Sequence, residues 1–163
     1  MKRPPFNSLL RNFSTVDYIL LLPAAIALFY TFYRAATLSL THDEALIYFL
    51  ASQYNTGQII GYIIPQDHML NTLLIHYSIS IFPDSEFFIR LPNLLGHLLF
   101  VIYSWLLLRR MKNEHLLIAG FIILNFNPYL FDFFSLARGY GLSVSLTMAS
   151  IYYAFSYSLQ KRF

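Results

Sequence analysis

Four long apolar segments restrict what this chain can fold into. They cover about residues 17–38, 91–108, 116–134 and 139–160. A helix needs roughly 20 apolar residues to cross the ~30 Å hydrocarbon core of a bilayer, and each segment is close to that length. We therefore expect an all-α polytopic membrane protein with four transmembrane helices, forming a single membrane domain over residues 1–163.

Composition supports a membrane protein over a soluble one. Hydrophobic residues make up 57% of the chain and charged residues only 12%, whereas soluble domains carry about 25% charged residues. The net charge of +3 does not indicate a nucleic-acid partner, because the basic residues lie at the ends of apolar segments. The chain has no cysteine, which excludes disulfides, thiolate metal sites and thiol nucleophiles.

Lysine and arginine positions predict the orientation in a multi-pass cell (inner) membrane. With both termini cytoplasmic, eight of the 11 basic residues lie inside, and Arg34, Arg90 and Arg138 lie outside. Six of the eight acids then lie outside. We interpret the first segment as a signal anchor and not as a cleaved signal peptide, because it is long and Arg34 sits near its end.

This topology leaves one large external segment, about residues 39–90. Its pattern predicts two external amphipathic surface helices separated by "NTGQIIGYIIPQD". The second helix, "HMLNTLLIHYSISIF", places its apolar side chains on one face and His68, Asn71, Thr72 and His76 on the other. Such a helix is expected to lie along the membrane surface, with His68 and Asn71 as candidates for substrate contact.

The stretch "LTHDEALIYF" begins the first external helix with two acids. "THDE" reads as a capping box in which Thr41 and Glu44 bond each other's backbone amides. Asp43 is not needed for this cap, so it is the candidate general base or divalent-metal ligand, and Glu44 is kept as a second catalytic candidate. The alternative is that both acids only stabilise the start of the helix. Spacing alone specifies no metal site.

A second polar cluster lies in "NPYLFDFFSLARGYGL". The short external connection holds Asp132, Ser135, Arg138 and Tyr140 at the membrane surface. Arg138 is suited to an anion such as phosphate, or it pairs with Asp132 and sets topology. Arg90 has the same two interpretations. We therefore expect Arg90, Arg138 and Tyr140 to contribute to substrate binding, and we expect His97 to form a hydrogen bond between helices.

The order of these motifs resembles the N-terminal part of GT-C superfamily membrane glycosyltransferases, of the group that contains dolichyl-phosphate-mannose protein mannosyltransferases and aminoarabinose transferases. The likeness runs from about Val16 to the end of the chain through four stretches. In order, these are "HDEA", "DHMLNTLLIHY", "SEFFIRLPNLLGHLL" and "NPYLFDFFSLARGYGL". It implies that Asp43 and Glu44 are the family's acidic pair, that His68 is its surface-helix histidine, and that Arg138 lies at the lipid-phosphate sugar site. Many relatives carry a proline directly after this histidine and an acid two residues before this arginine, and here these positions are Met69 and Leu136.

The resemblance implies transfer of a sugar from a polyprenyl-phosphate carrier to an acceptor at the external membrane face. The implied partners are membrane lipid and the polyprenyl-phosphate sugar donor. Relatives have more spans, so the chain is expected to be an N-terminal portion that is inactive without its C-terminal half or a partner subunit. The alternative is a small four-helix membrane protein that binds lipid or a partner without catalysis.

Overall fold

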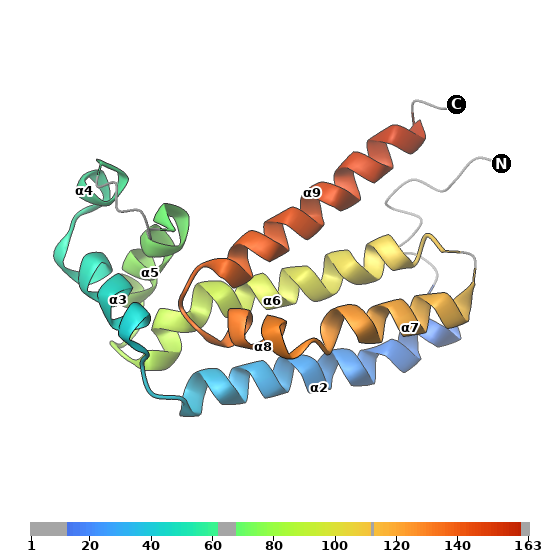
Figure 1. The fold of residues 1–163 in the computed structure, drawn as a ribbon, viewed down its shortest axis with the longest axis horizontal. Coiled ribbons are helices and arrows are strands. Elements are labelled where there is room, and N and C mark those ends of the chain that lie inside the picture. Colours follow the sequence, from blue (N-terminus) through green and yellow to red (C-terminus); the bar gives the residue numbers. More distant parts are fainter. Residues whose placement is uncertain (1–12, 62–67, 112, 161–163) are drawn as a thin grey trace.

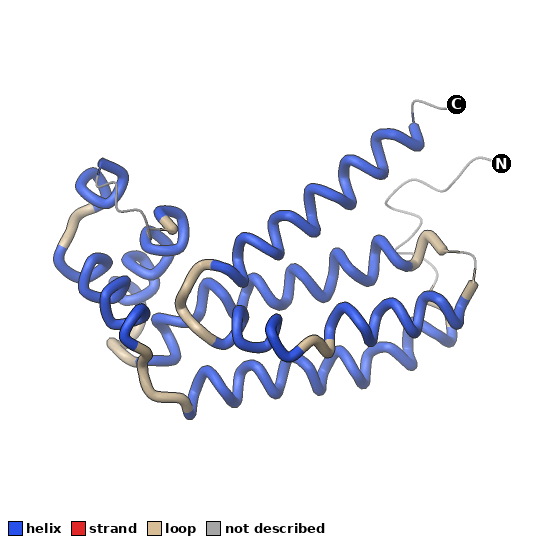
Figure 2. The backbone as a smooth tube through the Cα atoms, in the orientation of Figure 1, coloured by secondary structure: helices blue, strands red, loops and turns tan. Residues whose placement is uncertain are grey.

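The computed structural model describes residues 13–61, 68–111 and 113–160, and these residues form helices and connections without a strand (Figures 1 and 2). Four of the helices are α3 (His42–Gln53), α4 (Thr56–Gly61), α5 (Met69–Ile81) and α8 (Pro128–Ser135). The other four are α2 (Thr15–Thr37), α6 (Glu86–Leu108), α7 (Glu114–Asn125) and α9 (Tyr140–Gln160). An all-α fold was predicted, and the described residues confirm it.

Helix α6 is the centre of the bundle. It packs most extensively against α9 and also contacts α2, α5, α7 and α8. Figure 1 shows α3, α4 and α5 gathered at one end of the molecule, while α2 begins and α9 ends at the other. The sequence prediction of two termini on one side and one external helical segment on the other is compatible with this arrangement.

Among the described residues, two helices, α2 and α6, are long and apolar enough to cross a membrane, and α7 with α8 makes a third candidate if the bent pair is one span. The prediction of four spans is therefore too high by this measure. Helix α9 has nearly the predicted bounds, but five serines and four tyrosines along it lower its hydropathy. The sequence prediction counted α9 as a span because the segment is long and has no formal charge.

Helix α6 begins at Glu86, five residues before the predicted start of the second span. Arg90 is therefore inside a helix and not in an external loop. Pro92 lies within the helix, where it removes one backbone N–H and leaves the carbonyl of Phe88 without its usual partner. The hydroxyl of Ser78 on α5 donates to that carbonyl at 2.7 Å. This side-chain bond allows the helix to start before its proline.

The third predicted span, 116–134, is two helices. Helices α7 and α8 meet at an angle of 53°. Asn127 caps α8, with its side-chain oxygen accepting from the amide of Tyr129 at 3.0 Å, and Pro128 occupies the first helical turn. Proline disfavours helical backbone at the residue before it, so the chain breaks here. The bend brings the end of α8 back toward α6.

Helices α6 and α9 cross closely through small residues. A Cβ on Gly96 would lie 3.2 Å from the Ser145 hydroxyl and 3.4 Å from the Leu142 backbone. The Ser145 hydroxyl lies 2.6 Å from the Gly96 carbonyl and 2.7 Å from the Gly141 carbonyl. Small residues with interhelical hydrogen bonds are typical of helix packing in membranes. This crossing fixes where α9 begins, next to α5.

Helix α5 turns its polar face inward. Asn71, Thr72 and Ser78 are buried, whereas the apolar residues of the opposite face are largely exposed. The exposed set is Met69, Leu70, Leu74, Tyr77 and Ile81. The two predicted faces are confirmed, and the apolar one is free to contact lipid as the surface-helix prediction requires. The short helix α4 was not predicted, and residues 62–67 of the same connection lie outside the described residues.

Candidate functional site

The connection between α8 and α9 brings the "ARGYG" stretch against α3 and α5. Gly139 has a φ of +76°, a backbone conformation that favours glycine. A Cβ at this position would lie 2.6 Å from the Cβ of His68. At Gly141 a Cβ would lie 2.6 Å from the carbonyl oxygen of Phe133. Both glycines therefore permit close approaches, of Gly139 to the His68 side chain and of Gly141 to the Phe133 carbonyl, that hold Arg138 beside α3 and α5.

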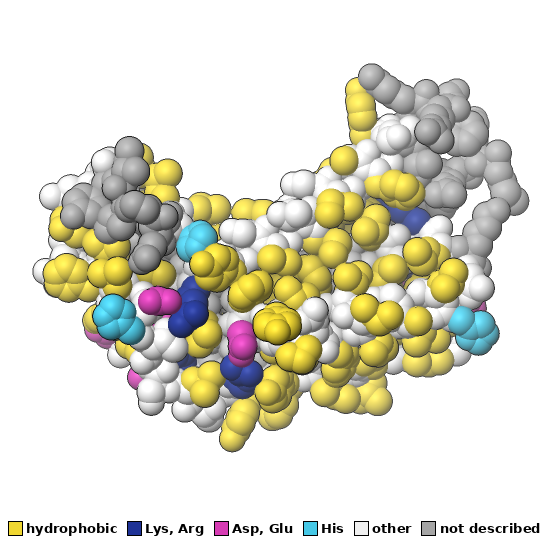
Figure 3. Space-filling model, in the orientation of Figure 1, with side chains coloured by type: hydrophobic (Ala, Val, Ile, Leu, Met, Phe, Trp, Pro, Cys, Tyr) yellow, Lys and Arg dark blue, Asp and Glu magenta, His cyan; other side chains and the backbone are white. Residues whose placement is uncertain are grey.

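Asp43 and Arg138 meet at this junction. The Arg138 Nη2 atom lies 3.4 Å from the Asp43 Oδ2 atom, and the two side chains are 35% and 58% exposed. His42 is almost fully exposed, with its Nδ1 3.9 Å from the other Asp43 oxygen. Figure 3 shows basic, acidic and histidine side chains gathered where α3 and α5 meet the bundle, beside a mostly apolar surface. The pair is thus accessible to a ligand.

Arg138 is not paired with Asp132, which was one interpretation of the sequence. Asp132 instead accepts a hydrogen bond from Arg34 at the end of α2. The Nε atom of Arg138 is buried and lacks a hydrogen-bond partner among the described residues. The guanidinium therefore has donor capacity left beyond its contact with Asp43.

His68 and Tyr140 form the next part of the junction. Their rings meet edge to face with centroids 4.8 Å apart. Tyr140 also lies against Phe133, with ring centroids 5.2 Å apart, and it is 44% exposed. His68 is the N-cap residue of α5 without a side-chain capping bond. An aromatic wall therefore lies beside the Asp43–Arg138 pair.

Asn71 is buried behind this wall and serves the loop backbone. Its side-chain nitrogen donates to the Ala137 carbonyl at 3.1 Å, and its oxygen accepts from Asn93 at 2.9 Å. The Asn93 oxygen in turn accepts from the Leu142 amide at 3.0 Å. Asn71 was predicted to contact substrate, but it is only 1% exposed. Its contacts hold the loop that carries Arg138. Asn93 was not among the sequence candidates.

Glu44 is a buried structural centre. The predicted capping box with Thr41 is confirmed. In addition, one carboxylate oxygen accepts from Arg90 Nε at 2.8 Å and from the Ala137 amide at 2.7 Å, and the other accepts from Arg90 Nη2 at 3.0 Å. Burial alone raises the pKa of this carboxyl group, but the hydrogen bonds from Arg90, Thr41 and Ala137 outweigh it and leave the pKa below its ordinary value.

Arg90 uses every donor inside the protein. Besides its two bonds to Glu44, its guanidinium donates to three backbone carbonyls at the end of α2, those of Ala35, Leu38 and Ser39. A guanidinium has five N–H donors, so none remains for a ligand. Arg90 is also completely buried. The predicted substrate contact of Arg90 and the predicted catalytic role of Glu44 find no geometric support here.

His97 bonds between helices as expected, with its Nδ1 2.7 Å from the Thr31 hydroxyl of α2. The candidate metal-ligand role of Asp43 is not accompanied by further ligands. No group of three or more His, Asp or Glu side chains able to hold a metal occurs among the described residues. Of the sequence candidates, then, Asp43, His68, Arg138 and Tyr140 come together at the surface. Glu44, Asn71 and Arg90 lie behind them.

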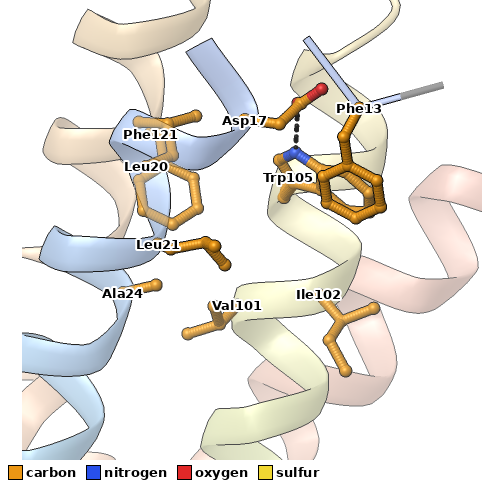
Figure 4. A pocket seen from close by; sticks show the side chains of 9 residues that line it. All are labelled: Phe13, Asp17, Leu20, Leu21, Ala24, Val101, Ile102, Trp105 and Phe121. Carbon is orange, nitrogen blue, oxygen red and sulfur yellow. Dashed lines mark hydrogen bonds between the residues drawn. The ribbon is translucent and has the colours of Figure 1, made fainter. Parts of the chain in front are cut away.

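An apolar cavity of about 200 Å³ lies at the opposite end of the bundle, between α2 and α6 (Figure 4). Asp17 closes it on one side, accepting from the Trp105 ring nitrogen at 2.8 Å and pairing with Arg109 at 2.9 Å. Figure 4 shows the rings of Phe13 and Trp105 lying against each other at the mouth. No local sequence pattern indicates this pair, since 88 residues separate Asp17 from Trp105.

Comparison of the chain with protein families, with curated proteins and with solved structures finds no match.

Proposed function

We propose that this chain forms part of an integral-membrane glycosyltransferase of the GT-C type, which moves a sugar from a polyprenyl-phosphate carrier to an acceptor at the external membrane face. The observation that carries the proposal is the exposed pair of Asp43 and Arg138, whose residues lie 95 positions apart in the sequence. An acid and an anion-binding cation at one accessible place are the two groups that such a transfer needs.

The two groups have complementary roles in a single displacement. The acceptor hydroxyl oxygen attacks the anomeric carbon, and the bond from that carbon to the phosphate oxygen breaks, with the electron pair leaving on the phosphate. Arg138 stabilises the negative charge that develops there. Asp43 takes the acceptor proton. The His68–Tyr140 wall offers an aromatic face to the sugar ring.

The resting pair of Asp43 and Arg138 does not block this chemistry. Its 3.4 Å separation and the exposure of both side chains make it a weak ion pair that an incoming phosphate can replace. Glu44 and Arg90 support the site from behind, since Glu44 binds the Ala137 amide beside Arg138. We assign them to positioning and not to contact with the substrate.

For this role we propose that α7 with α8 forms one bent span and that α9 forms a fourth. This arrangement places the ends of α2, α8 and the start of α9 on the external face, with α3, α4 and α5 beside them. The beginning of α2 and the end of α9 then lie in the cytoplasm, as the distribution of Lys and Arg predicts.

Binding of polyprenyl phosphate to the chain in lipid nanodiscs tests the proposal. Arg138→Gln should weaken binding at least about tenfold, because a charge-assisted contact to phosphate is lost. Asp43→Asn should strengthen binding about twofold to fivefold, because Arg138 loses its competing partner. Arg34→Gln is the matched control, since it removes another ion-paired arginine at the same end of the bundle and should leave binding unchanged.

Transfer itself is measured with a polyprenyl-phosphate sugar in membranes that hold the complete enzyme. Asp43→Asn should abolish transfer while insertion and phosphate binding persist. Full activity in that variant would exclude Asp43 as the base. If Arg138→Gln and Arg34→Gln weaken phosphate binding equally, the basic residues act only by general charge, and the non-catalytic lipid-binding alternative is the better account.

A further inference from the structure

A second polar site lies between α3 and α5, apart from the Asp43–Arg138 pair. It is an open hollow of about 250 Å³. Its lining consists of Tyr48, Ala51, Ser52, His76, Ile79, Ser80 and Asp84. None of these residues has a role in the proposed transfer. The chemistry of the hollow follows from where each of its polar side chains places its proton.

The histidine presents a lone pair. His76 Nδ1 lies 2.7 Å from the carbonyl oxygen of Ala51. A carbonyl only accepts, so Nδ1 carries the hydrogen and the neutral ring keeps Nε2 as an acceptor. Nε2 has no hydrogen-bond partner recorded among the described residues.

The hydroxyls present lone pairs as well. Ser52 donates to the Phe49 carbonyl at 3.0 Å, and Ser80 donates to the His76 carbonyl at 2.6 Å. Each hydroxyl has a single hydrogen, so both oxygens are left as acceptors. Tyr48 donates its hydrogen to Asp84. That hydrogen bond, with a smaller effect of burial, raises the pKa of Tyr48 and keeps the phenol protonated.

The hollow therefore has one carboxylate, several neutral acceptors and no side-chain donor to spare. Asp84 uses one oxygen for Tyr48, and its other oxygen has no recorded partner in the described part of the chain. A ligand that matches this surface brings a positive charge and several N–H donors. Ala51 and Ile79 add apolar contact for the carbon next to that charge.

We propose that this hollow binds a primary ammonium group on an alkyl carbon. An ammonium has three donors, which can reach Asp84, His76 Nε2 and a serine oxygen. A divalent metal fits less well, because the described residues contain no cluster of three His, Asp or Glu side chains that could ligate one. The ammonium can come from an aminolipid headgroup or from a soluble amine. The same two helices expose Phe49, Tyr77 and Ile81, so a lipid headgroup lies within their reach if they rest on the membrane.

The test uses the complete chain in nanodiscs made only of choline phospholipid, which has the charge but lacks N–H donors. Histidine is labelled with ¹⁵N, and His76→Gln identifies the His76 signals. Ethylammonium should shift the Nε2 signal of His76 in a saturable way, and tetramethylammonium should not. Nanodiscs that contain phosphatidylethanolamine should produce the shift without added amine if the source is the membrane. A shift with free ethylammonium alone identifies a soluble source.

Two matched variants assign the site. Asp84→Asn keeps an oxygen for Tyr48 but removes the charge, and it should weaken ethylammonium binding at least about tenfold. Glu86→Gln removes another exposed carboxylate two residues away and should leave binding unchanged. Equal shifts with tetramethylammonium, no shift with either amine source, or full binding by Asp84→Asn would each overturn the proposal. The proposal would also be overturned if Zn²⁺ shifted the His76 signal in a way that depends on His76 and Asp84 while ethylammonium did not shift it.

Discussion

Glu44 and Arg90, 46 residues apart, form a completely buried ion pair in which both carboxylate oxygens and all five guanidinium N–H groups are satisfied. Together they join the end of α2, the start of α3, helix α6 and the Ala137 amide. One pair thus fixes α3 and the loop that carries Arg138 on the bundle.

Glu44→Gln should destabilise the chain by about 3–5 kcal/mol, because it leaves Arg90 buried without a counter-charge. Thermal or denaturant unfolding in detergent micelles, followed by circular dichroism, measures this loss. Glu114→Gln, at an exposed acid in the first turn of α7, is the control and should cost less than about 1 kcal/mol. The double variant Glu44→Gln/Arg90→Gln should lose less than the sum of the single variants. Additive losses would contradict the pairing.

Stability should depend on pH through Glu44. Its folded pKa lies below the ordinary value of 4.5, so the unfolded chain takes up the proton first as the pH falls. The stabilisation is therefore fully present above about pH 4.5 and is lost as the pH falls through the folded pKa. Melting temperatures measured from pH 7 to pH 3 should show this loss. Glu44→Gln should show a shallower decline in the acid range, and identical profiles for the two proteins would contradict the assignment.

Gly139→Ala should disturb the loop at Arg138. The new Cβ would have to occupy a φ of +76° and a position 2.6 Å from His68 Cβ, so the loop or α5 must move. We expect a loss of more than about 1 kcal/mol in unfolding free energy and weaker polyprenyl-phosphate binding. Gly61→Ala is the control, because nothing lies within 4 Å of its added Cβ. Equal effects at the two glycines would show that the close contact is unimportant.

The bond from Ser78 to the Phe88 carbonyl should matter only because of Pro92. Ser78→Ala should cost about 1–3 kcal/mol, since it leaves a buried carbonyl without a donor. In a Pro92→Ala background the alanine amide can bond to that carbonyl, so the same serine change should cost less. Unfolding of the four proteins of this double-mutant cycle measures the difference. A serine effect that is independent of residue 92 would refute the explanation of the early α6 start.

The absence of cysteine from the sequence makes topology directly measurable. Single-cysteine variants Asn55→Cys, Asn113→Cys and Ser158→Cys are each treated with a membrane-impermeant thiol reagent on intact cells. We expect labelling at position 55 only, and labelling at positions 113 and 158 after permeabilisation. External labelling at position 158 would show that α9 does not cross, and the number of spans would then be at most three.

Local sequence signals predicted the helices well, since a cap or an apolar run depends on residues that are neighbours in the sequence. The Thr41–Glu44 cap and the nearly correct bounds of α9 follow from such signals. The early start of α6 depends on Ser78, which lies ten residues before the carbonyl that it binds, and no local pattern reveals that bond. The same holds for Arg90 and Asn71, which were expected to contact substrate because a polar side chain at a membrane surface suggests a ligand. Their actual partners are carbonyls and side chains brought near by the fold.

The outward-facing apolar side of α5 has a consequence for handling the protein. Under the proposed topology its exposed apolar side chains rest on lipid, while its buried Asn71 holds the loop beside Arg138. A detergent that covers the long helices but removes that lipid would leave α5 without its apolar surroundings. The loop would then lose its support although the bundle stays folded. Retained native lipid should therefore decide whether an extracted preparation keeps an intact site.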